Sequence, residues 1–225
     1  AAFVIAALLL ILTFVNASWL APKPVGGVKL VAHRGVYQLY DHRGIGRDSC
    51  TADRIEQPVH DYLQNSTRSM QAAARIGADM VEIDIAPTAD GQFAVYHDWI
   101  VGCRTEGGGD TRSKTLADLQ ALDIGHDYTA DGGKSFPFRG RRKDRMPSLE
   151  EALAALPNTP IIFNFKSKNP READQLAAAL KAARRDVVER RDAFYGHSGP
   201  VDRIRDHFPE TWAWTKEDAK ACTKD

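Results

Sequence analysis

Two acidic residues, Glu82 and Asp84, lie two positions apart in the alternating stretch 79–85. Residues two apart on a β-strand face the same side, so both carboxylates are expected to project together, away from the apolar side chains between them. Two carboxylates that lose water together repel each other, and one keeps a proton unless a cation lies between them. A hard, oxygen-ligated ion such as Mg²⁺ or Ca²⁺ removes this conflict. The alternative is an exposed edge strand with water on its polar face.

The stretch 160–166 repeats this arrangement with Asn164 and Lys166, whose apolar neighbours Phe163 and Phe165 point to the other side. Four polar groups on two strands are therefore expected to face inward. Lys166 provides a point charge that can stabilise a pentacoordinate phosphorus, and Arg34 provides a fork of donors suited to phosphate oxygens. Ordinary ion pairing of these two cations with the acidic pair is the alternative, and it does not exclude a function.

Two histidines, His33 and His97, each close an apolar run and are followed by a charged residue. Catalytic groups of (β/α) barrels lie at the carboxyl ends of the strands, so both imidazoles are expected where the carboxylates emerge. Imidazole titrates near neutrality, so one ring can accept a proton from a nucleophile while the other donates one to the leaving oxygen. A single histidine is more often a core or surface residue, but the pair favours catalysis. The remaining histidines lack such a context: His42, His60, His126, His197 and His207.

Strands and helices alternate along the chain. The sequence predicts strands at 28–34, 79–85, 92–97, 160–166, 193–195 and 211–214, and helices at 67–76, 116–122, 149–156, 171–185 and 201–208. Long polar loops are expected at 36–64 and 100–146. This order is typical of a parallel α/β fold, here a TIM-type (β/α) barrel. A closed barrel has eight strands, so we expect the barrel to be incomplete at its C-terminus, without its last two βα units.

The first twenty residues form a separate apolar segment without charges. As a helix, about 20 residues at roughly 1.5 Å each would cross a hydrocarbon layer of about 30 Å, with Trp19 at the interface. The segment 1–20 is therefore predicted as a transmembrane anchor or a signal segment, because 15–17 also resembles a cleavage site. A buried core helix is the third alternative. The first two readings place the barrel domain, residues 28–225, on the periplasmic or extracellular side, with the anchor as the contact to the membrane.

The cysteines and the net charge limit which cellular compartment and which partners are expected. Cys50 and Cys103 lie in predicted loops and can pair in an oxidising compartment, whereas Cys222 has no evident partner, and three unrelated thiols remain the alternative. The spacing does not fit a zinc site. A net charge of zero gives no field to recruit nucleic acid, so no nucleic-acid partner is expected. The basic run 139–145 is interpreted as a solvated loop, with contact to anionic lipid headgroups as the minor alternative.

Several motifs, in this order and spacing, resemble the glycerophosphodiester phosphodiesterase family. They are His33-Arg-Gly35, Gln64-Asn-Ser66, Gly77-Ala-Asp-Met-Val-Glu-Ile-Asp84, Thr88-Ala-Asp-Gly91 and His97-Asp98. Two later segments also resemble this family, Arg104-Thr-Glu-Gly-Gly-Gly109 and Met146-Pro-Ser-Leu-Glu-Glu-Ala152. The similarity covers about residues 29–168.

The resemblance implies acid and base roles for His33 and His97, and a Mg²⁺ or Ca²⁺ ion on Glu82 and Asp84. It also implies that Arg34 and Lys166 lie near the phosphate. The sequence departs from the family pattern at two positions, and both changes reduce the negative charge of the expected site. The family usually has an acid where Gln64 stands and Glu-x-Lys where Asn164-x-Lys166 stands. Asn164 can still offer a carbonyl oxygen as a metal ligand, although affinity should fall.

The expected function is metal-dependent hydrolysis of glycerophosphodiesters, which releases an alcohol and glycerol phosphate from a small-molecule or lipid phosphodiester. Two alternatives remain open. One is lysophospholipase D-type hydrolysis of membrane lysophospholipids, which attachment to a bilayer would favour. The other is a catalytically impaired barrel that binds a phosphorylated ligand, for which Gln64 and Asn164 are the supporting residues.

Overall fold

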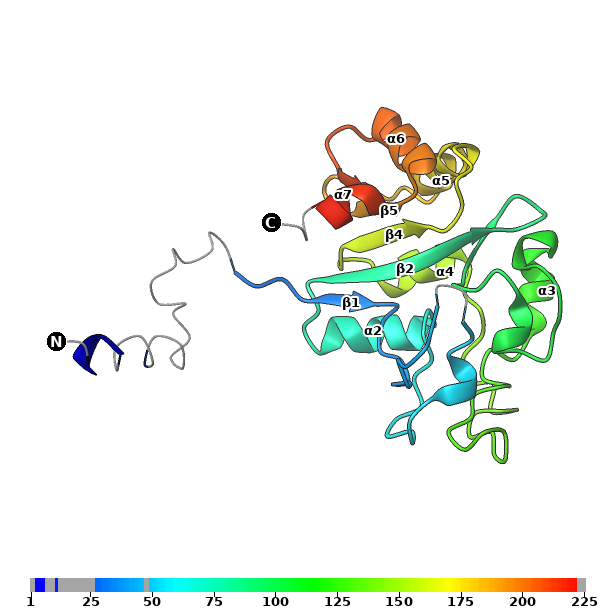
Figure 1. Ribbon diagram of the computed structural model, residues 1–225. Coiled ribbons are helices and arrows are strands. Elements are labelled where there is room, and N and C mark those ends of the chain that lie inside the picture. The colour runs from blue at the N-terminus through cyan, green and yellow to red at the C-terminus, as the bar shows by residue number, and fades with distance from the viewer. Residues whose placement is uncertain (1–2, 7–10, 12–26, 47–48, 222–225) are drawn as a thin grey trace.

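The computed structural model describes residues 3–6, 11, 27–46 and 49–221, whose core is one six-stranded sheet with helices packed on it (Figure 1). The strands are β1 (Val31–His33), β2 (Met80–Pro87), β3 (Phe93–Val95), β4 (Ile161–Phe165), β5 (Ala193–Gly196) and β6 (Trp212–Thr215). The α-helices are α2 (Thr67–Arg75), α3 (Leu116–Ala121), α4 (Leu149–Ala155), α5 (Arg171–Ala182), α6 (Ser198–His207) and α7 (Lys216–Ala221). Short 3-10 helices lie in the loops: η2 (Ala52–Arg54), η3 (Val101–Cys103) and η4 (Thr111–Ser113).

The sheet has the parallel order that the strand–helix alternation predicts, β1-β2-β4-β5-β6. Its register places Asp84 beside Asn164 and Glu82 beside His33. The remaining strand, β3, runs antiparallel to the end of β2 and forms a hairpin with it. The prediction of a third barrel strand is therefore wrong at this point, because the turn after β2 is too short for a crossover. His97 follows the hairpin instead of ending a parallel strand.

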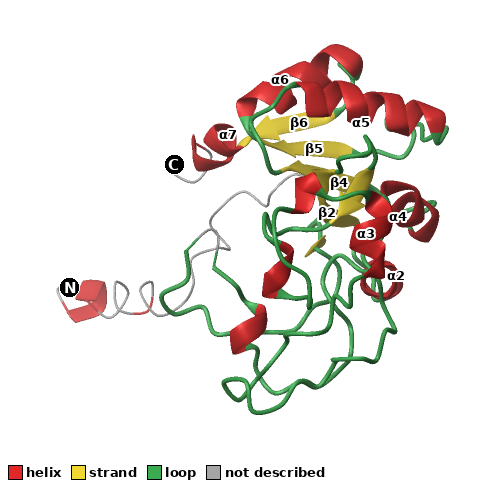
Figure 2. Cartoon of the chain, turned by 90° about the vertical axis from the view of Figure 1, so that its right-hand side faces the viewer, coloured by secondary structure: helices red, strands yellow, loops and turns green. Residues whose placement is uncertain are grey.

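The main apolar core lies between the sheet and the helices α2, α4, α5 and α6. Figure 2 shows α5 and α6 beside β5 and β6, and α2 and α4 nearer to β2. Val81, Ile83 and Ile85 point into this core and are fully buried. Glu82 and Asp84 therefore face the opposite side, as the alternation predicts. Other large side chains of the core are Met70, Leu153, Phe163, Phe165, Leu176, Leu180, Phe194 and Ile204.

The two long loops pack against each other and form a lobe with its own apolar core. We call residues 49–64 and 98–147 together the loop lobe; it occupies the lower right of Figure 1. Its backbone is tied together by hydrogen bonds such as Thr129 N to Ala52 O, at 2.9 Å. This core lies on the side of β3 from which Ala94 projects, and it reaches Tyr96, just before His97. It consists of Ala52, Ile55, Leu63, Ala94, Tyr96, Val101, Leu116, Leu119, Ile124, Tyr128, Phe138 and Met146.

A disulfide bond joins Cys50 to Cys103 within the loop lobe, in agreement with the predicted pairing. Cys222 lies outside the described residues, as does most of the apolar segment 1–20, in which only 3–6 and 11 are described. Among the described residues, no helix has both the length and the apolar character needed to cross a membrane. The predicted anchor or signal segment therefore remains a prediction.

Candidate active site

Arg34 is fixed in the turn that follows β1. It has a φ of 62° and the next residue, Gly35, has a φ of 77°, so the chain reverses sharply here. The backbone N–H of Arg34 donates to the carbonyl of Glu82 at 3.0 Å, and that of Asn65 donates to the carbonyl of Arg34 at 2.9 Å. These bonds hold the residue against β2. Its guanidinium Nε then lies 2.9 Å from Asp84 Oδ2.

Asp84 is fully buried and surrounded by donors and cations. In addition to Arg34, Lys166 Nζ lies 3.4 Å from its Oδ1, and Asn65 Nδ2 donates to its Oδ2 at 3.0 Å. Burial alone would raise the pKa of Asp84, but attraction to Arg34 and Lys166 outweighs burial and lowers that pKa. Asp84 is therefore a carboxylate at neutral pH. The predicted ion pairing of the two cations with an acidic residue is present on this one carboxylate.

Glu82 and Asn164 complete the polar cluster. Asn164 Nδ2 donates to Glu82 Oε1 at 2.8 Å and to Asp84 Oδ1 at 3.1 Å, so the amide bridges the two carboxylates. Burial, together with repulsion from Asp84, raises the pKa of Glu82. Among the described residues, two buried oxygens of this cluster accept no hydrogen bond, namely Glu82 Oε2 and Asn164 Oδ1.

These unpartnered oxygens test whether the residues fit a divalent cation. A carboxylate oxygen and an amide oxygen are ligands that Mg²⁺ and Ca²⁺ prefer, and a buried oxygen without a partner is costly unless something binds it. Glu82, Asp84 and Asn164 therefore fit a hard cation. The described residues contain no cluster of three or more His, Cys, Asp or Glu side chains arranged to hold a metal. Asn164, as an amide, is not one of these residue types.

Both predicted catalytic histidines lie near this cluster, within the electrostatic influence of Asp84. His33 is half-exposed, with Nε2 3.9 Å from Glu82 Oε2. Partial burial and the charge of Arg34 lower the pKa of His33, and a charge on His97 would lower that pKa further. The two imidazoles therefore lie within electrostatic reach of each other. His97 is more buried and its Nδ1 lies 2.6 Å from Asp98 Oδ1.

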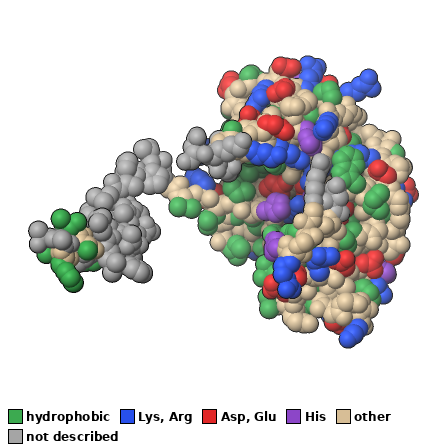
Figure 3. All heavy atoms as spheres, in the orientation of Figure 1, with side chains coloured by type: hydrophobic (Ala, Val, Ile, Leu, Met, Phe, Trp, Pro, Cys, Tyr) green, Lys and Arg blue, Asp and Glu red, His purple; other side chains and the backbone are tan. Residues whose placement is uncertain are grey.

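A cavity of about 260 Å³ opens beside His97. Figure 3 shows histidine, acidic and basic side chains gathered in a hollow on this face. Lys166 connects the cavity to the buried acidic cluster, because its side chain lines the cavity and reaches Asp84. The outer wall is more apolar, with Trp99, Ile100 and the disulfide. The lining residues are Ser49, Cys50, His97, Asp98, Trp99, Ile100, Cys103 and Lys166.

Several residues that contact the site were not among the predicted site residues. Asn65 donates to Asp84, and Gln64 lies between two guanidinium groups, those of Arg34 and Arg104. Arg104 in turn contacts Asp98. In the sequence, these residues stood out only because they belong to the motifs of the family. A loop sequence without periodicity does not reveal which strand end the loop approaches. The five histidines expected to be outside the site do not line the cavity.

The fold is an open α/β sheet with five parallel strands, and its polar site lies toward the carboxyl ends of β1, β2 and β4. Comparison with known proteins identifies the family: the "Glycerophosphoryl diester phosphodiesterase family" matches residues 42–200. This match covers more than half of the chain. The chain belongs to this family, as its motifs predict.

Individual relatives are similar to parts of this chain. "Uncharacterized protein Rv2277c" of Mycobacterium tuberculosis is 27% identical over 135 residues, which are 58% of this chain and 44% of the relative. "Glycerophosphodiester phosphodiesterase 1" of Mus musculus is 31% identical over 60% of this chain and 38% of its own length. The human "Lysophospholipase D GDPD1" is 30% identical over 48% of this chain and 34% of its own length.

A solved structure supports the fold. The crystal structure of the glycerophosphoryl diester phosphodiesterase domain of Rv2277c has a TM-score of 0.64 to this chain, with 20% identity over 87% of this chain and 63% of that structure. This likeness establishes the TIM-barrel-like architecture. The chain spans less than half the length of the curated relatives named above.

Proposed function

We propose that this protein hydrolyses phosphodiesters of the glycerophosphodiester type, releasing an alcohol and glycerol phosphate. The observation that carries the proposal is the buried Asp84–Glu82–Asn164 cluster, which lies between Arg34 and Lys166 and beside two imidazoles. Membership of the phosphodiesterase family supports it. The printed names of the mouse and human relatives describe glycerophosphodiester phosphodiesterase and lysophospholipase D activities of those proteins.

Glu82, Asp84 and Asn164 would hold one divalent cation, Mg²⁺ or Ca²⁺. Such an ion would withdraw charge from the phosphate oxygens and favour attack at phosphorus. Lys166, which lines the cavity, would bind a non-bridging phosphate oxygen, and Arg34, which pairs with the same carboxylate, would bind another. The phosphate therefore competes with Asp84 for both cations.

The two histidines would move the protons. One imidazole accepts the proton of the attacking hydroxyl as the new P–O bond forms, and the other donates a proton to the leaving oxygen as the old P–O bond breaks. Burial lowers the pKa of both rings, so the free site holds two neutral imidazoles. The negative charge of a bound phosphodiester would raise the pKa of the ring that donates the proton to the alcohol that leaves.

Lysophospholipids are the second candidate substrates. The apolar outer wall of the cavity, with Trp99, Ile100 and the disulfide, favours a glycerol backbone that carries an acyl chain. We also propose that the domain works outside the cytoplasm, attached to a membrane through the N-terminal segment. The Cys50–Cys103 disulfide supports the first part of this proposal, because disulfides persist in oxidising compartments.

The test is turnover of glycerophosphocholine and lysophosphatidylcholine, with and without chelator, by the wild-type protein and by His33→Ala and His97→Ala. We expect chelation to stop turnover, and each substitution to lower kcat by at least about 100-fold, since positioned acids and bases contribute this much. His207→Ala is the matched control, because His207 also pairs with a carboxylate, Asp174, but lies on α6 outside the cavity. Equal turnover by His33→Ala and wild type would instead indicate a barrel that only binds its ligand.

A further inference from the structure

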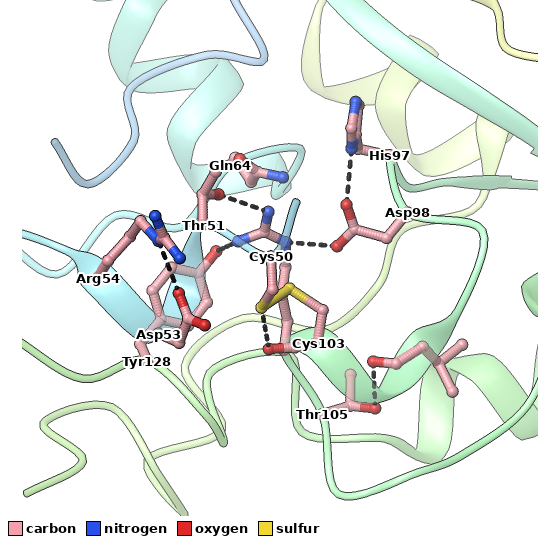
Figure 4. The surroundings of a disulfide bond; sticks show 12 residues. Cys50, Thr51, Asp53, Arg54, Gln64, His97, Asp98, Cys103, Thr105 and Tyr128 are labelled. Atoms are coloured by element: carbon pink, nitrogen blue, oxygen red, sulfur yellow. Dashed lines mark hydrogen bonds and ion pairs between the residues drawn. A yellow bond between two sulfur atoms is a disulfide. The ribbon is translucent and has the colours of Figure 1, made fainter. Parts of the chain in front are cut away.

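A continuous set of buried contacts connects the disulfide to His97 (Figure 4). Arg104, which directly follows Cys103, donates from Nε to Asp98 Oδ2 at 2.8 Å. The other oxygen of Asp98 lies 2.6 Å from His97 Nδ1. On the opposite side, Arg104 Nη2 donates at 2.9 Å to the hydroxyl of Thr51, the residue after Cys50. Thr51 and Arg104, which are hydrogen-bonded to each other, thus each directly follow one of the two bonded cysteines.

The guanidinium of Arg104 is bound on all three nitrogens. Its side chain is only 3% exposed, and Nη1 donates to the hydroxyl of Tyr128 at 3.0 Å, which completes the set formed with Asp98 and Thr51. A buried arginine is tolerated only where its charge is paired and its N–H groups find acceptors. These contacts leave the guanidinium little freedom to move. The loop lobe therefore fixes the position of the guanidinium, and the guanidinium in turn holds the carboxylate of Asp98.

Asp98 depends on this arginine for its charge. Burial alone would raise the pKa of Asp98, but the attraction of Arg104 and the hydrogen bond with His97 outweigh burial and lower that pKa. An ionised Asp98 can only accept, so His97 must carry its proton on Nδ1. Nε2, the other ring nitrogen, is directed away from Asp98 in Figure 4 and is left to exchange protons with a substrate.

The disulfide joins the two different loops that carry Thr51 and Arg104. The covalent bond between Cys50 and Cys103, the residues that precede them, ties these loops together. Cys50 and Cys103 also line the cavity beside His97, so displacement of either loop would change the wall as well as the arginine. A crosslink restricts the conformations that two such loops can adopt.

We propose that Arg104 is a positioning residue, which fixes the tautomer and orientation of His97 through Asp98, and that the Cys50–Cys103 disulfide holds Arg104 in this place. The inference rests on the proposed function only in giving His97 an acid–base role. The tautomer of the His97 ring can be measured without a substrate. Failure of the inference can therefore be distinguished from failure of the proposed function.

The first experiment is ¹⁵N NMR of the protein with labelled histidine, in which the His97 signals are identified by their loss in His97→Asn. We expect the wild-type ring to carry its proton on Nδ1. The variants are Arg104→Met, Thr51→Val and the double variant Cys50→Ser with Cys103→Ser. In each we expect a mixture of tautomers with a larger share of Nε2–H.

Arg185→Met is the matched control, because Arg185 is also a buried, ion-paired arginine, bound to Asp192 away from the cavity. Its loss should lower stability without changing the His97 signals. If Arg104→Met fails to fold, Thr51→Val decides, since it removes a single hydroxyl. An unchanged Nδ1-protonated ring in the folded Thr51→Val and cysteine variants would overturn the proposal.

The second experiment separates kcat from KM with glycerophosphocholine. We expect the cysteine variant and Thr51→Val to lower kcat by roughly tenfold and to change KM by less than about twofold, since orienting partners act on the reacting group. A fall in stability alone would reduce the amount of folded enzyme and would leave the His97 tautomer unchanged. Wild-type protein without turnover would refute the proposed function, while the NMR result would still decide the inference.

Discussion

At the scale of single residues, Asn164 distinguishes this site from the pattern of its family. Its amide donates to both Glu82 and Asp84, a role that a carboxylate at this position cannot take. A glutamate here would place a third negative charge in a buried cluster whose countercharges are Arg34 and Lys166. If the proposed metal ion binds here, the neutral amide would make the cluster less dependent on that ion for its stability and would lower its affinity for the ion.

The substitution Asn164→Glu tests this balance. We expect Ca²⁺ or Mg²⁺ to bind at least about tenfold more tightly, since an added charge at contact distance is worth more than 1.4 kcal/mol even at a high effective dielectric constant. Without metal the variant should unfold at a lower temperature than the wild type, because the new carboxylate is repelled. Calorimetric titration and thermal unfolding with and without the ion measure both effects.

Asn158→Glu is the control for the same chemical change, because Asn158 is exposed and contacts Arg190 instead of the site. It should leave both metal affinity and the effect of metal on unfolding unchanged. Equal metal affinity of Asn164→Glu and wild type would exclude position 164 from the ligands.

The sequence predicted which of these side chains share a face of the sheet, for a clear physical reason. Alternation along a strand fixes which side chains share a face, so Glu82 with Asp84, and Asn164 with Lys166, could be placed together without a structure. The contacts of Asp98 with Arg104 and of Arg104 with Thr51 could not be predicted. They join residues from different loops, and no local pattern specifies where such a loop returns.

At the scale of elements, the turn between β1 and α2 positions Arg34. A Cβ at Gly35 would lie 2.7 Å from the carbonyl carbon of Ser69 and 2.8 Å from the nitrogen of Met70, both backbone atoms of α2. Val36 N also donates to the carbonyl of Ser69 at 3.2 Å. The glycine thus permits both the positive φ and the close approach of the turn to the helix.

Gly35→Ala should therefore destabilise the protein and displace Arg34. We expect the free energy of unfolding to fall by about 2 kcal/mol or more, because a side chain at positive φ and a steric overlap with backbone act together. Denaturant unfolding measures this change. Gly108→Ala is the comparison, since a Cβ there meets no heavy atom of the described residues within 4 Å. Equal stability of Gly35→Ala and wild type would show that α2 can retreat from the turn.

Most elements of the fold were predicted from periodicity and capping residues. The helix α4 begins after Ser148, whose side chain and that of Glu151 form a capping box, close to the predicted start. The hairpin of β2 with β3 was not anticipated as such. Phe93, Ala94 and Val95 have the composition of a barrel strand, and only the short preceding turn distinguishes a return along β2 from a parallel crossover.

At the scale of the whole molecule, the described part of the sheet ends in an accessible strand. Among the described strands, β6 pairs with β5 alone, and Trp212 on β6 is 64% exposed and stacks on Trp214 at 4.3 Å between ring centroids. Unpaired strand edges with apolar side chains can pair with another chain.

A protein of residues 27–225 should therefore associate as its concentration rises. Trp212→Lys should lower the association constant by about tenfold or more, because a charge on an edge strand opposes pairing. Sedimentation velocity over a range of concentrations measures this, with Val59→Lys as control, since Val59 is exposed in a loop and lies outside the sheet. A monomer at every concentration would refute the prediction.

The separate apolar core of the loop lobe has a consequence for how specificity can diverge. The lobe supplies most of the cavity lining and the arginine that contacts Asp98, whereas β2 and β4 supply the acidic cluster, and Arg34 and Lys166 directly follow β1 and β4. Insertions or substitutions in the lobe can therefore remodel the opening without altering the register of β2 and β4. Exchange of this lobe between homologous barrels should transfer preference for one alcohol over another, while the reaction at phosphorus is retained.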